Sequence, residues 1–250
     1  MIQTLKNLGG RIWALWAAIA FVSTMLIFLV PFFIFCYFQK EPKKTFRFIS
    51  YSRVWMWIFL RMIGCPLTVY GRENFASGKN YIVLCNHNSL MDVPVSSPAI
   101  PGGNKTIAKS EMAKIPLFGY LYKTGSVLVD RKSDASRKDS YHEMKRVLKM
   151  GLHMCIYPEG TRNKTGQPLK FFHNGGFRLA AETRTAIIPA IIFNTKKVLP
   201  ADKAFYVEPH PLSIHFLPPV LPDPEESVED LKNKVFKLMK DFYENNQPGS

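Results

Sequence analysis

The stretch YIVLCNHNSLMDVPV, residues 81–95, places an apolar run directly before a cluster of polar side chains. Residues 81–85 are apolar and rich in β-branched or aromatic side chains, which predicts a short buried strand. Four polar residues, 86–89, end that strand, and Asp92 follows His87 by five positions. Because chemistry tends to lie at the carboxyl ends of strands in a parallel sheet, this stretch predicts an active site at a strand end.

Short apolar segments alternate with helical patterns along the chain after Cys65. The predicted strands are residues 67–70, 81–85, 105–108, 126–129, 153–157, 186–192, 204–207 and 212–217. The predicted helices are residues 136–151, 175–184 and 228–242. Such alternation predicts an α/β domain with a mixed, largely parallel sheet flanked by helices.

The composition predicts an acidic partner. The 250 residues include 33 Lys+Arg against 19 Asp+Glu, a formal net charge of +14. Such a bias is typical of proteins that bind nucleic acid, anionic lipid or a phosphorylated substrate. No recognisable nucleic-acid module is present, so we expect no nucleic-acid partner. The four cysteines lack C-x-x-C spacing, and the sequence therefore predicts neither a zinc site nor a disulfide framework.

The N-terminal segment predicts a hydrophobic membrane anchor. Residues 12–38 form a run of 27 without a charged side chain. A helix of that length reaches roughly 40 Å, which is more than a bilayer core requires and longer than the apolar part of a signal peptide. The basic flank at residues 40–47 predicts that the following domain lies on the cytoplasmic face. The run either spans the membrane or lies in its plane.

A second apolar segment, residues 51–64, is short for a membrane span. Its tryptophans are flanked by arginines, which is typical of a helix at the lipid interface. The alternative is a buried helix of the globular domain. We expect residues 1–64 to form the membrane-anchoring helices and residues 65–250 to form the catalytic domain.

The spacing of His87 and Asp92 restricts how the two side chains meet. Five residues on a regular helix turn through about 500°, which would point the pair apart. Contact requires His87 on a turn and Asp92 in the first turn of the next helix. The carboxylate would then hold one imidazole nitrogen and leave the other free as a base. Capping of that helix by Asp92 is the alternative interpretation of this spacing alone.

The segment YPEGTRN, residues 157–163, also follows an apolar strand. Pro158 and Gly160 predict a tight turn with open backbone N–H groups, and Arg162 follows on the loop. Arginine is suited to bidentate recognition of phosphate, although the composition alone favours a solvated arginine on an ordinary turn. A further basic residue, Lys109, lies just past another predicted strand.

Four ordered blocks together resemble one family, the glycerolipid acyltransferases, and among them most closely the 1-acylglycerol-3-phosphate (lysophosphatidic acid) acyltransferases. The resemblance covers roughly residues 64–220. The blocks are Asn86-His87-x4-Asp92, Gly125-x4-Asp130-Arg131, Pro158-Glu159-Gly160-Thr161-Arg162 and Ile187-Ile188-Pro189-Ala190.

The resemblance implies transfer of an acyl group from acyl-CoA or acyl carrier protein to the sn-2 hydroxyl of lysophosphatidic acid, giving phosphatidic acid, without a metal or bound cofactor. In that mechanism His87 is the general base and Asp92 orients it. Backbone N–H groups near the Gly160 turn are candidate donors to the oxyanion. The resemblance also implies residues that bind the phosphate or shape the acceptor loop: Lys109, Arg131, Glu159, Gly160, Thr161 and Arg162.

The sequence departs from the family pattern in places. Tyr157 stands where phenylalanine is usual, which is a conservative change, and His173 and Asn174 stand where the family often has basic residues that contact phosphate. Another lyso-acceptor, such as an acylated amino-acid lipid, is the alternative substrate, because the motifs constrain the thioester and hydroxyl chemistry more than the acceptor. A non-catalytic lipid-surface protein of the same fold is a further alternative, but it predicts loss of the His-Asp or Glu-Gly-Thr-Arg residues, and both are intact.

Overall fold

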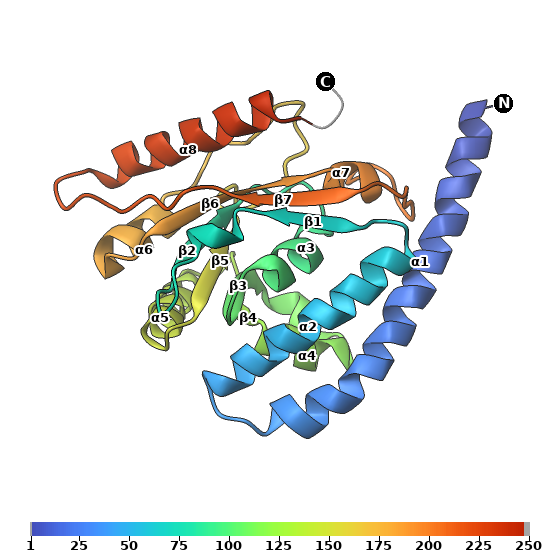
Figure 1. Cartoon of the computed structure of the whole chain (residues 1–250), viewed down its shortest axis with the longest axis horizontal. Coiled ribbons are helices and arrows are strands. Elements are labelled where there is room, and N and C mark those ends of the chain that lie inside the picture. Colours follow the sequence, from blue (N-terminus) through green and yellow to red (C-terminus); the bar gives the residue numbers. More distant parts are fainter. Residues whose placement is uncertain (1, 248–250) are drawn as a thin grey trace.

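The computed structural model describes residues 2–247 as a single seven-stranded sheet covered by helices on both faces (Figure 1). The strand order is β1-β7-β6-β2-β5-β3-β4. All pairings are parallel except that of β6 with β7, which is antiparallel. The strands are β1 Leu67–Tyr70, β2 Ile82–Cys85, β3 Asn104–Lys109, β4 Ser126–Val129, β5 His153–Ile156, β6 Ile187–Phe193 and β7 Leu212–Phe216. The predicted mixed, largely parallel α/β sheet is confirmed.

The helices divide into two layers, one on each face of the sheet (Figure 1). The first layer contains α1 Ile2–Phe32, its π-helical extension η1 Phe33–Tyr37, α2 Lys43–Met62, α3 Asp92–Ala99, α4 Phe118–Thr124 and α7 Thr195–Val198. The second layer contains α5 Asp134–Lys149, α6 Gly175–Thr183 and α8 Val228–Asn245. Short 3-10 turns, η2 Arg72–Asn74 and η3 Ser110–Lys114, join the remaining elements.

The central strands are buried on both faces, which explains their continuous apolar sequences. Every residue of β2, β5 and β6 is buried. Residues that alternate along β2 belong to different cores: Val83 packs with α1–α4, and Leu84 packs with α5, α6 and α8. Because β2 and β5 pair in parallel, their carboxyl ends lie side by side, and the polar segment that follows each strand begins there.

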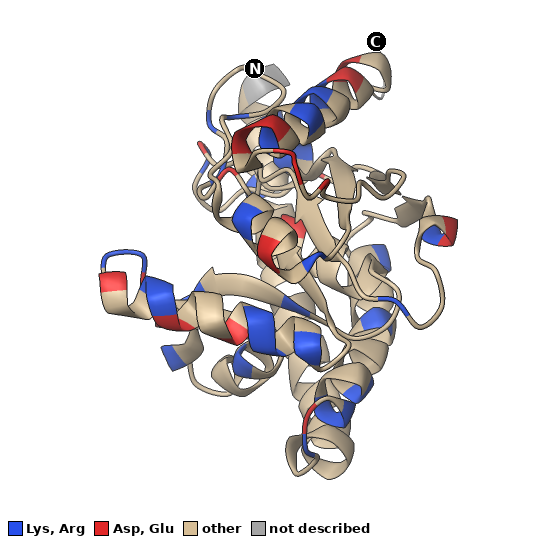
Figure 2. Cartoon of the chain, turned by 90° about the vertical axis from the view of Figure 1, so that its left-hand side faces the viewer, with Lys and Arg blue, Asp and Glu red and all other residues tan. Residues whose placement is uncertain are grey.

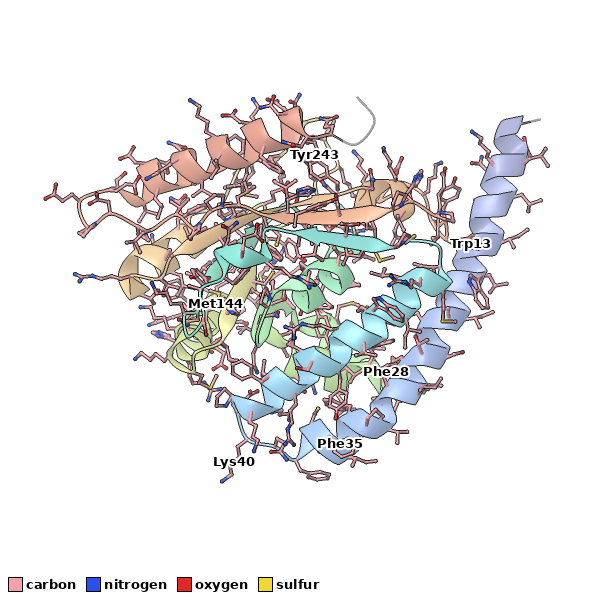
Figure 3. The ribbon with its side chains drawn as sticks, viewed as in Figure 1. Trp13, Phe28, Phe35, Lys40, Met144 and Tyr243 are labelled. Carbon is pink, nitrogen blue, oxygen red and sulfur yellow. The ribbon has the colours of Figure 1, made fainter. Side chains whose placement is uncertain are left out.

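Helix α1 lies along the domain and leaves one apolar face open. Trp13 donates its indole N–H to the Ile63 carbonyl at 3.0 Å, and Phe28 stacks on Trp55 of α2 (Figure 3). The segment Thr4–Tyr37 is long and apolar enough to cross a membrane by length and composition. Its outer side chains remain exposed, for example Ile27 at 66% and Ile34 at 63%. Such a continuous exposed apolar face is consistent with membrane association.

Helix α2 begins earlier than predicted, at Lys43 rather than residue 51. The Glu41 carboxylate accepts hydrogen bonds from the backbone N–H and hydroxyl of Thr45, so the basic flank forms the first turn of the helix. One side of α2 is buried against its neighbours, whereas Trp57 is 58% exposed under the guanidinium of Arg61.

The predicted strand at residues 204–207 is wrong. The Val207 N–H donates to the carbonyl of Gly10 in α1 at 3.0 Å, and the Tyr206 ring lies against Gly10, where a side chain would collide with it. Phe205 adopts a positive φ of 48°, which is incompatible with a strand. Tyr206 and Val207 are therefore buried by packing on α1 instead of by strand pairing, and Phe205 is exposed.

Candidate active site

The segment after β2 brings His87 and Asp92 together at the carboxyl edge of the sheet. His87 lies on the turn beyond β2, and Asp92 is the first residue of α3. His87 Nδ1 is 2.8 Å from Asp92 Oδ2. This is the one arrangement in which the five-residue spacing allows contact between the two side chains.

The hydrogen bonds around Asp92 determine which nitrogen of His87 carries the proton. Asp92 is fully buried, and its Oδ2 also accepts the backbone N–H groups of Asn88 at 2.6 Å and Ser89 at 2.8 Å. Because this oxygen faces three donors, we assign the proton to His87 Nδ1. Within residues 2–247, Nε2 has no hydrogen-bond partner, so its lone pair is available as a base.

Two further contacts hold this segment and the His87 ring. The ring of Tyr157 stacks on the imidazole with a centroid separation of 4.4 Å, and the Tyr157 hydroxyl lies 2.8 Å from Ser96 Oγ in α3. The side chain of Asn86 bonds both the carbonyl and the N–H of Ile192 in β6. The base is thereby fixed between β2, β5 and α3.

Glu159, in the turn after β5, is buried and joins both polar segments. Its Oε1 accepts the backbone N–H of His87 at 2.7 Å, and its Oε2 accepts that of Lys170 at 3.1 Å. Burial raises the pKa of Glu159 to about 7, the two backbone bonds oppose this rise, and the negative charge of Asp92 adds to it. The side chain therefore acts as a clamp that holds the loop to the backbone of the base.

The turn itself requires glycine at position 160. Gly160 has φ of 70°, and a Cβ there would lie 2.7 Å from the His173 ring. The expected open N–H groups are absent at two positions: the Gly160 N–H donates to Tyr157 and the Thr161 N–H to Glu159. The prediction that this turn presents free backbone donors is wrong for these two residues, because the tight turn uses both internally.

Beyond the turn, a hollow of about 310 Å³ is lined by cationic and hydroxyl side chains. The lining residues are Thr161, Arg162, Lys164, Thr165 and Lys170. The Lys170 ammonium donates to the Thr161 hydroxyl at 2.7 Å. The loop that carries the hollow is joined to the segment of the base, because the backbone N–H of Asn163 donates to the backbone carbonyl of His87 at 2.6 Å. Its chemistry suits a phosphate group.

Positive charge also gathers around His173. Burial lowers the pKa of this imidazole, and the neighbouring charges of Lys170, Arg131 and Lys232 lower it further. Arg131, on the turn after β4, therefore lies within electrostatic reach of the acceptor loop. Lys232 of α8 donates to Asn174, next to His173, at 3.0 Å. These cations occupy the region in which His173 and Asn174 replace basic residues of the family pattern.

Lys109, another predicted site residue, is paired with a carboxylate. It ends β3 at the same edge of the sheet, but its ammonium pairs with Glu111 at 3.0 Å. Within residues 2–247, no hydrogen bond or ion pair joins Lys109 to His87 or Arg162.

Sequence reasoning missed Lys164, Thr165 and the stacking of Tyr157 on His87. The signal for the two loop residues was their position directly after the Glu-Gly-Thr-Arg segment. No group of three or more His, Cys, Asp or Glu side chains suited to a metal ion occurs in the part of the chain that the structure describes.

Comparisons with known proteins agree with this geometry. A family model described as Acyltransferase matches residues 66–193. A 1-acyl-sn-glycerol-3-phosphate acyltransferase of Cocos nucifera is 34% identical over 201 residues, 80% of this chain and 62% of that protein. One of Helicobacter pylori (strain J99) is 30% identical over 171 residues, 68% of this chain and 69% of that protein. The chain thus spans less than two thirds of the Cocos relative's length.

A solved structure extends the comparison to nearly the whole fold. The crystal structure of the 1-acyl-sn-glycerophosphate (LPA) acyltransferase PlsC from Thermotoga maritima superposes with a TM-score of 0.79 and 23% identity, over 97% of this chain and 96% of that one. The likeness therefore includes the N-terminal helices as well as the sheet. From the family model that matches half of its length and from the Helicobacter relative, the chain belongs to the acyltransferase family.

Proposed function

We propose that the protein transfers a fatty acyl group from an acyl thioester to the free sn-2 hydroxyl of lysophosphatidic acid, forming phosphatidic acid. The observation that carries the proposal is His87, whose Nδ1 contacts Asp92 and whose Nε2 is unpartnered within residues 2–247, on a segment hydrogen-bonded to the loop that carries a cationic hollow of about 310 Å³. A base and a cationic hollow on neighbouring segments match an acceptor that carries both a hydroxyl and a phosphate. Curated relatives are named for this activity.

The reaction follows from the geometry of the pair. Nε2 of His87 removes the proton of the acceptor hydroxyl while its oxygen forms a bond to the thioester carbonyl carbon. Collapse of the tetrahedral intermediate breaks the C–S bond, and the imidazolium returns the proton to the leaving thiolate. Asp92 stabilises the imidazolium through the 2.8 Å contact with Nδ1. No acyl-enzyme forms.

In this proposal the cations hold the acceptor. Arg162 and Lys170 line the hollow and bind the phosphate, with Arg131 contributing from the neighbouring turn. Glu159, Gly160 and Thr161 shape the loop. Lys109 reaches the phosphate only after it releases Glu111. The donor is acyl-CoA or acyl carrier protein, since the net charge of +14 favours either acidic carrier.

We further propose that helix α1 lies in the plane of the membrane surface rather than spanning it, and that residues 1–64 anchor a catalytic domain of residues 65–250. The helix contacts the domain near both ends, through Gly10 with Val207 and through Phe33 with Tyr120. These ends are roughly 35 Å apart along the helix, about the thickness of a bilayer core. A span would draw the domain into the lipid. The basic residues after η1 favour the cytoplasmic face.

An acyl-transfer assay tests the reaction and the acceptor together. Detergent-purified protein receives a labelled acyl-CoA or acyl carrier protein, with lysophosphatidic acid or a non-phosphorylated lyso-acceptor. We expect transfer to lysophosphatidic acid only, lost in His87→Ala and retained in the matched variant of an exposed histidine in α5, His142→Ala. Equal transfer to the non-phosphorylated acceptor would contradict the phosphate role of the hollow, and full activity of His87→Ala would contradict the base.

A further inference from the structure

A second cationic hollow lies between the start of α2 and helix α4, where the figures show the two N-terminal helices turning back on each other (Figures 1 and 2). It measures about 250 Å³. Its lining comes from four separate elements and one turn: Tyr37 of η1, Glu41 of the turn after it, Lys44 of α2, Lys105 of β3, and Tyr120, Lys123 and Thr124 of α4.

Two of the three lysines that line this hollow have no acidic partner in the part of the chain that the structure describes. Lys105 is buried and donates to Glu41 at 2.8 Å, so these two charges neutralise each other at the floor. Glu41 is also fixed by Thr45, as part of the start of α2. Within residues 2–247, neither Lys44 nor Lys123 has a carboxylate at ion-pair distance. The hollow therefore carries a net positive charge of two on side chains free to bind an anion.

The walls of the hollow are aromatic and rigid. The rings of Tyr37 and Tyr120 meet edge to face with centroids 5.9 Å apart, and Phe33 packs on Tyr120 at 5.5 Å. The ammonium of Lys44 lies over the Tyr37 ring, 5.0 Å from its centroid. Lys44 is thereby held against an aromatic wall of the hollow, and Lys123 is an exposed residue that lines it from α4.

This hollow is separate from the candidate active site. Lys105 is in register with Met154 of β5, which is in register with Ile82 of β2. His87 lies five residues beyond Ile82, so the two sites are about 15 Å or more apart along the strand direction. The catalytic pair is at the carboxyl edge of the sheet, and the second hollow is at the amino edge.

Exposed apolar side chains lie on the elements that line the hollow. Phe38 is 82% exposed, Ile34 is 63% exposed and Phe35 is 47% exposed at the end of the open face of α1. At α4, Leu117 and Tyr120 are each 45% exposed. Apolar and basic side chains thus occur together on these elements, a combination typical of protein surfaces at the headgroup level of a bilayer.

From these observations we propose that the hollow binds the phosphate headgroup of an anionic membrane phospholipid. Its volume of about 250 Å³ is below the range of about 300–1,000 Å³ that encloses a drug-sized ligand, and it suits a headgroup whose acyl chains stay in the bilayer. Lys44 and Lys123 contact the phosphate, and Tyr37 and Tyr120 flank it. The site fixes the α1–α2 end of the protein to anionic lipid.

The experiment compares vesicle binding of the full chain and two charge-matched variants. The pocket variant is Lys44→Gln with Lys123→Gln, and the control is Lys40→Gln with Lys43→Gln, which removes two exposed lysines beside the hollow. Vesicles contain phosphatidylcholine alone or with phosphatidylglycerol, which is neither substrate nor product of the proposed reaction. Inorganic phosphate is added in a separate arm.

We expect the pocket variant to lose about 100-fold in affinity for the anionic vesicles, from two charge-assisted hydrogen bonds. The control loses roughly twentyfold or less at low salt and nothing at high salt, where diffuse attraction is screened. Equal losses in both variants at high salt would overturn the site. Binding of inorganic phosphate that is lost in the pocket variant, together with equal vesicle binding by both variants, would assign the hollow to free phosphate instead and would also overturn it.

The inference rests on the proposed placement of α1 in the membrane surface. The vesicle experiment distinguishes a failure of that placement from a failure of the headgroup site. Binding to neutral vesicles reports α1 alone and is expected to be unchanged in both variants. Acyl transfer in detergent is likewise expected to be unchanged, because neither variant alters His87 or the acceptor hollow.

Discussion

Replacement of Asp92 by asparagine separates the charge of this residue from its shape. Asp92 Oδ2 faces three donors, from Asn88, Ser89 and His87. The amide oxygen of the variant is held at the same place, because an amide NH2 there would face the two backbone N–H groups. The nitrogen then takes the position of Oδ1, a buried atom without a hydrogen-bond partner within residues 2–247. We therefore expect the fold and the His87 tautomer to persist in Asp92→Asn.

The Asp92→Asn variant loses the electrostatic stabilisation of the His87 imidazolium that forms in the transition state. Two charges about 4 Å apart at an effective dielectric constant near 20 attract by about 4 kcal/mol. A neutral amide dipole retains part of this attraction, so about 2–4 kcal/mol is lost and kcat falls roughly 30- to 1,000-fold. The assay is kcat at saturating acceptor, beside unfolding temperature and the matched variant Asp139→Asn of an exposed carboxylate in α5. A kcat within about threefold of the unaltered protein would show that Asp92 does not stabilise the imidazolium by its charge.

Three other variants test the loop after β5. Burial raises the pKa of Glu159 to about 7 from 4.5, so the folded protein binds this proton more tightly than the unfolded chain, and stability falls by about 3 kcal/mol as pH rises through that window. Urea unfolding at several pH values should show this slope, and Glu159→Gln should remove it. Arg162→Ala should raise the KM for lysophosphatidic acid by about 10- to 100-fold through loss of a charge-assisted contact, and unchanged steady-state kinetics would exclude that role. Gly160→Ala should lower stability by about 1–3 kcal/mol because φ is 70° and the His173 ring blocks the Cβ; thermal unfolding equal to that of the unaltered protein would contradict the strain.

The sequence predicted those parts of the fold that depend on local pattern. Seven of the eight predicted strands are present within about two residues of their expected ends. Their continuous apolar sequences reflect burial on both faces, which leaves a clear signal. The eighth, residues 204–207, has the same apolar character, but Tyr206 and Val207 are buried by a long-range contact with Gly10. No local pattern distinguishes these two ways of burying a short segment.

Helices α3 and α4 were not assigned bounds from the sequence because both are short. Helix α3 has the sequence DVPVSSPA. It contains Pro94 in its first turn and Pro98 further inside, and it has no apolar stripe. Its stability comes from packing, since Val95 is fully buried in the core shared with α1 and α2. Its first residue, Asp92, was nevertheless located correctly, because contact with His87 required a helix to begin there.

The candidate site was predictable where residues are close in sequence and hidden where they are not. The link between His87 and Glu159 joins residues 72 positions apart and depends on the pairing of β2 with β5. Likewise, the second cationic hollow combines η1, α2, β3 and α4. Such groupings follow from strand order, which depends on the packing of the whole chain and has no signature within any one segment.

The central claim is that Nε2 of His87 removes the proton of the acceptor hydroxyl. The most direct measurement is the single-turnover rate of acyl transfer by His87→Gln, with the exposed His142→Gln as its matched control and circular dichroism to verify the fold. We predict a loss of about 10²–10⁴-fold for His87→Gln, the usual range for a general base, and no loss for the control. A folded His87→Gln protein that turns over at the rate of the unaltered protein would contradict the account.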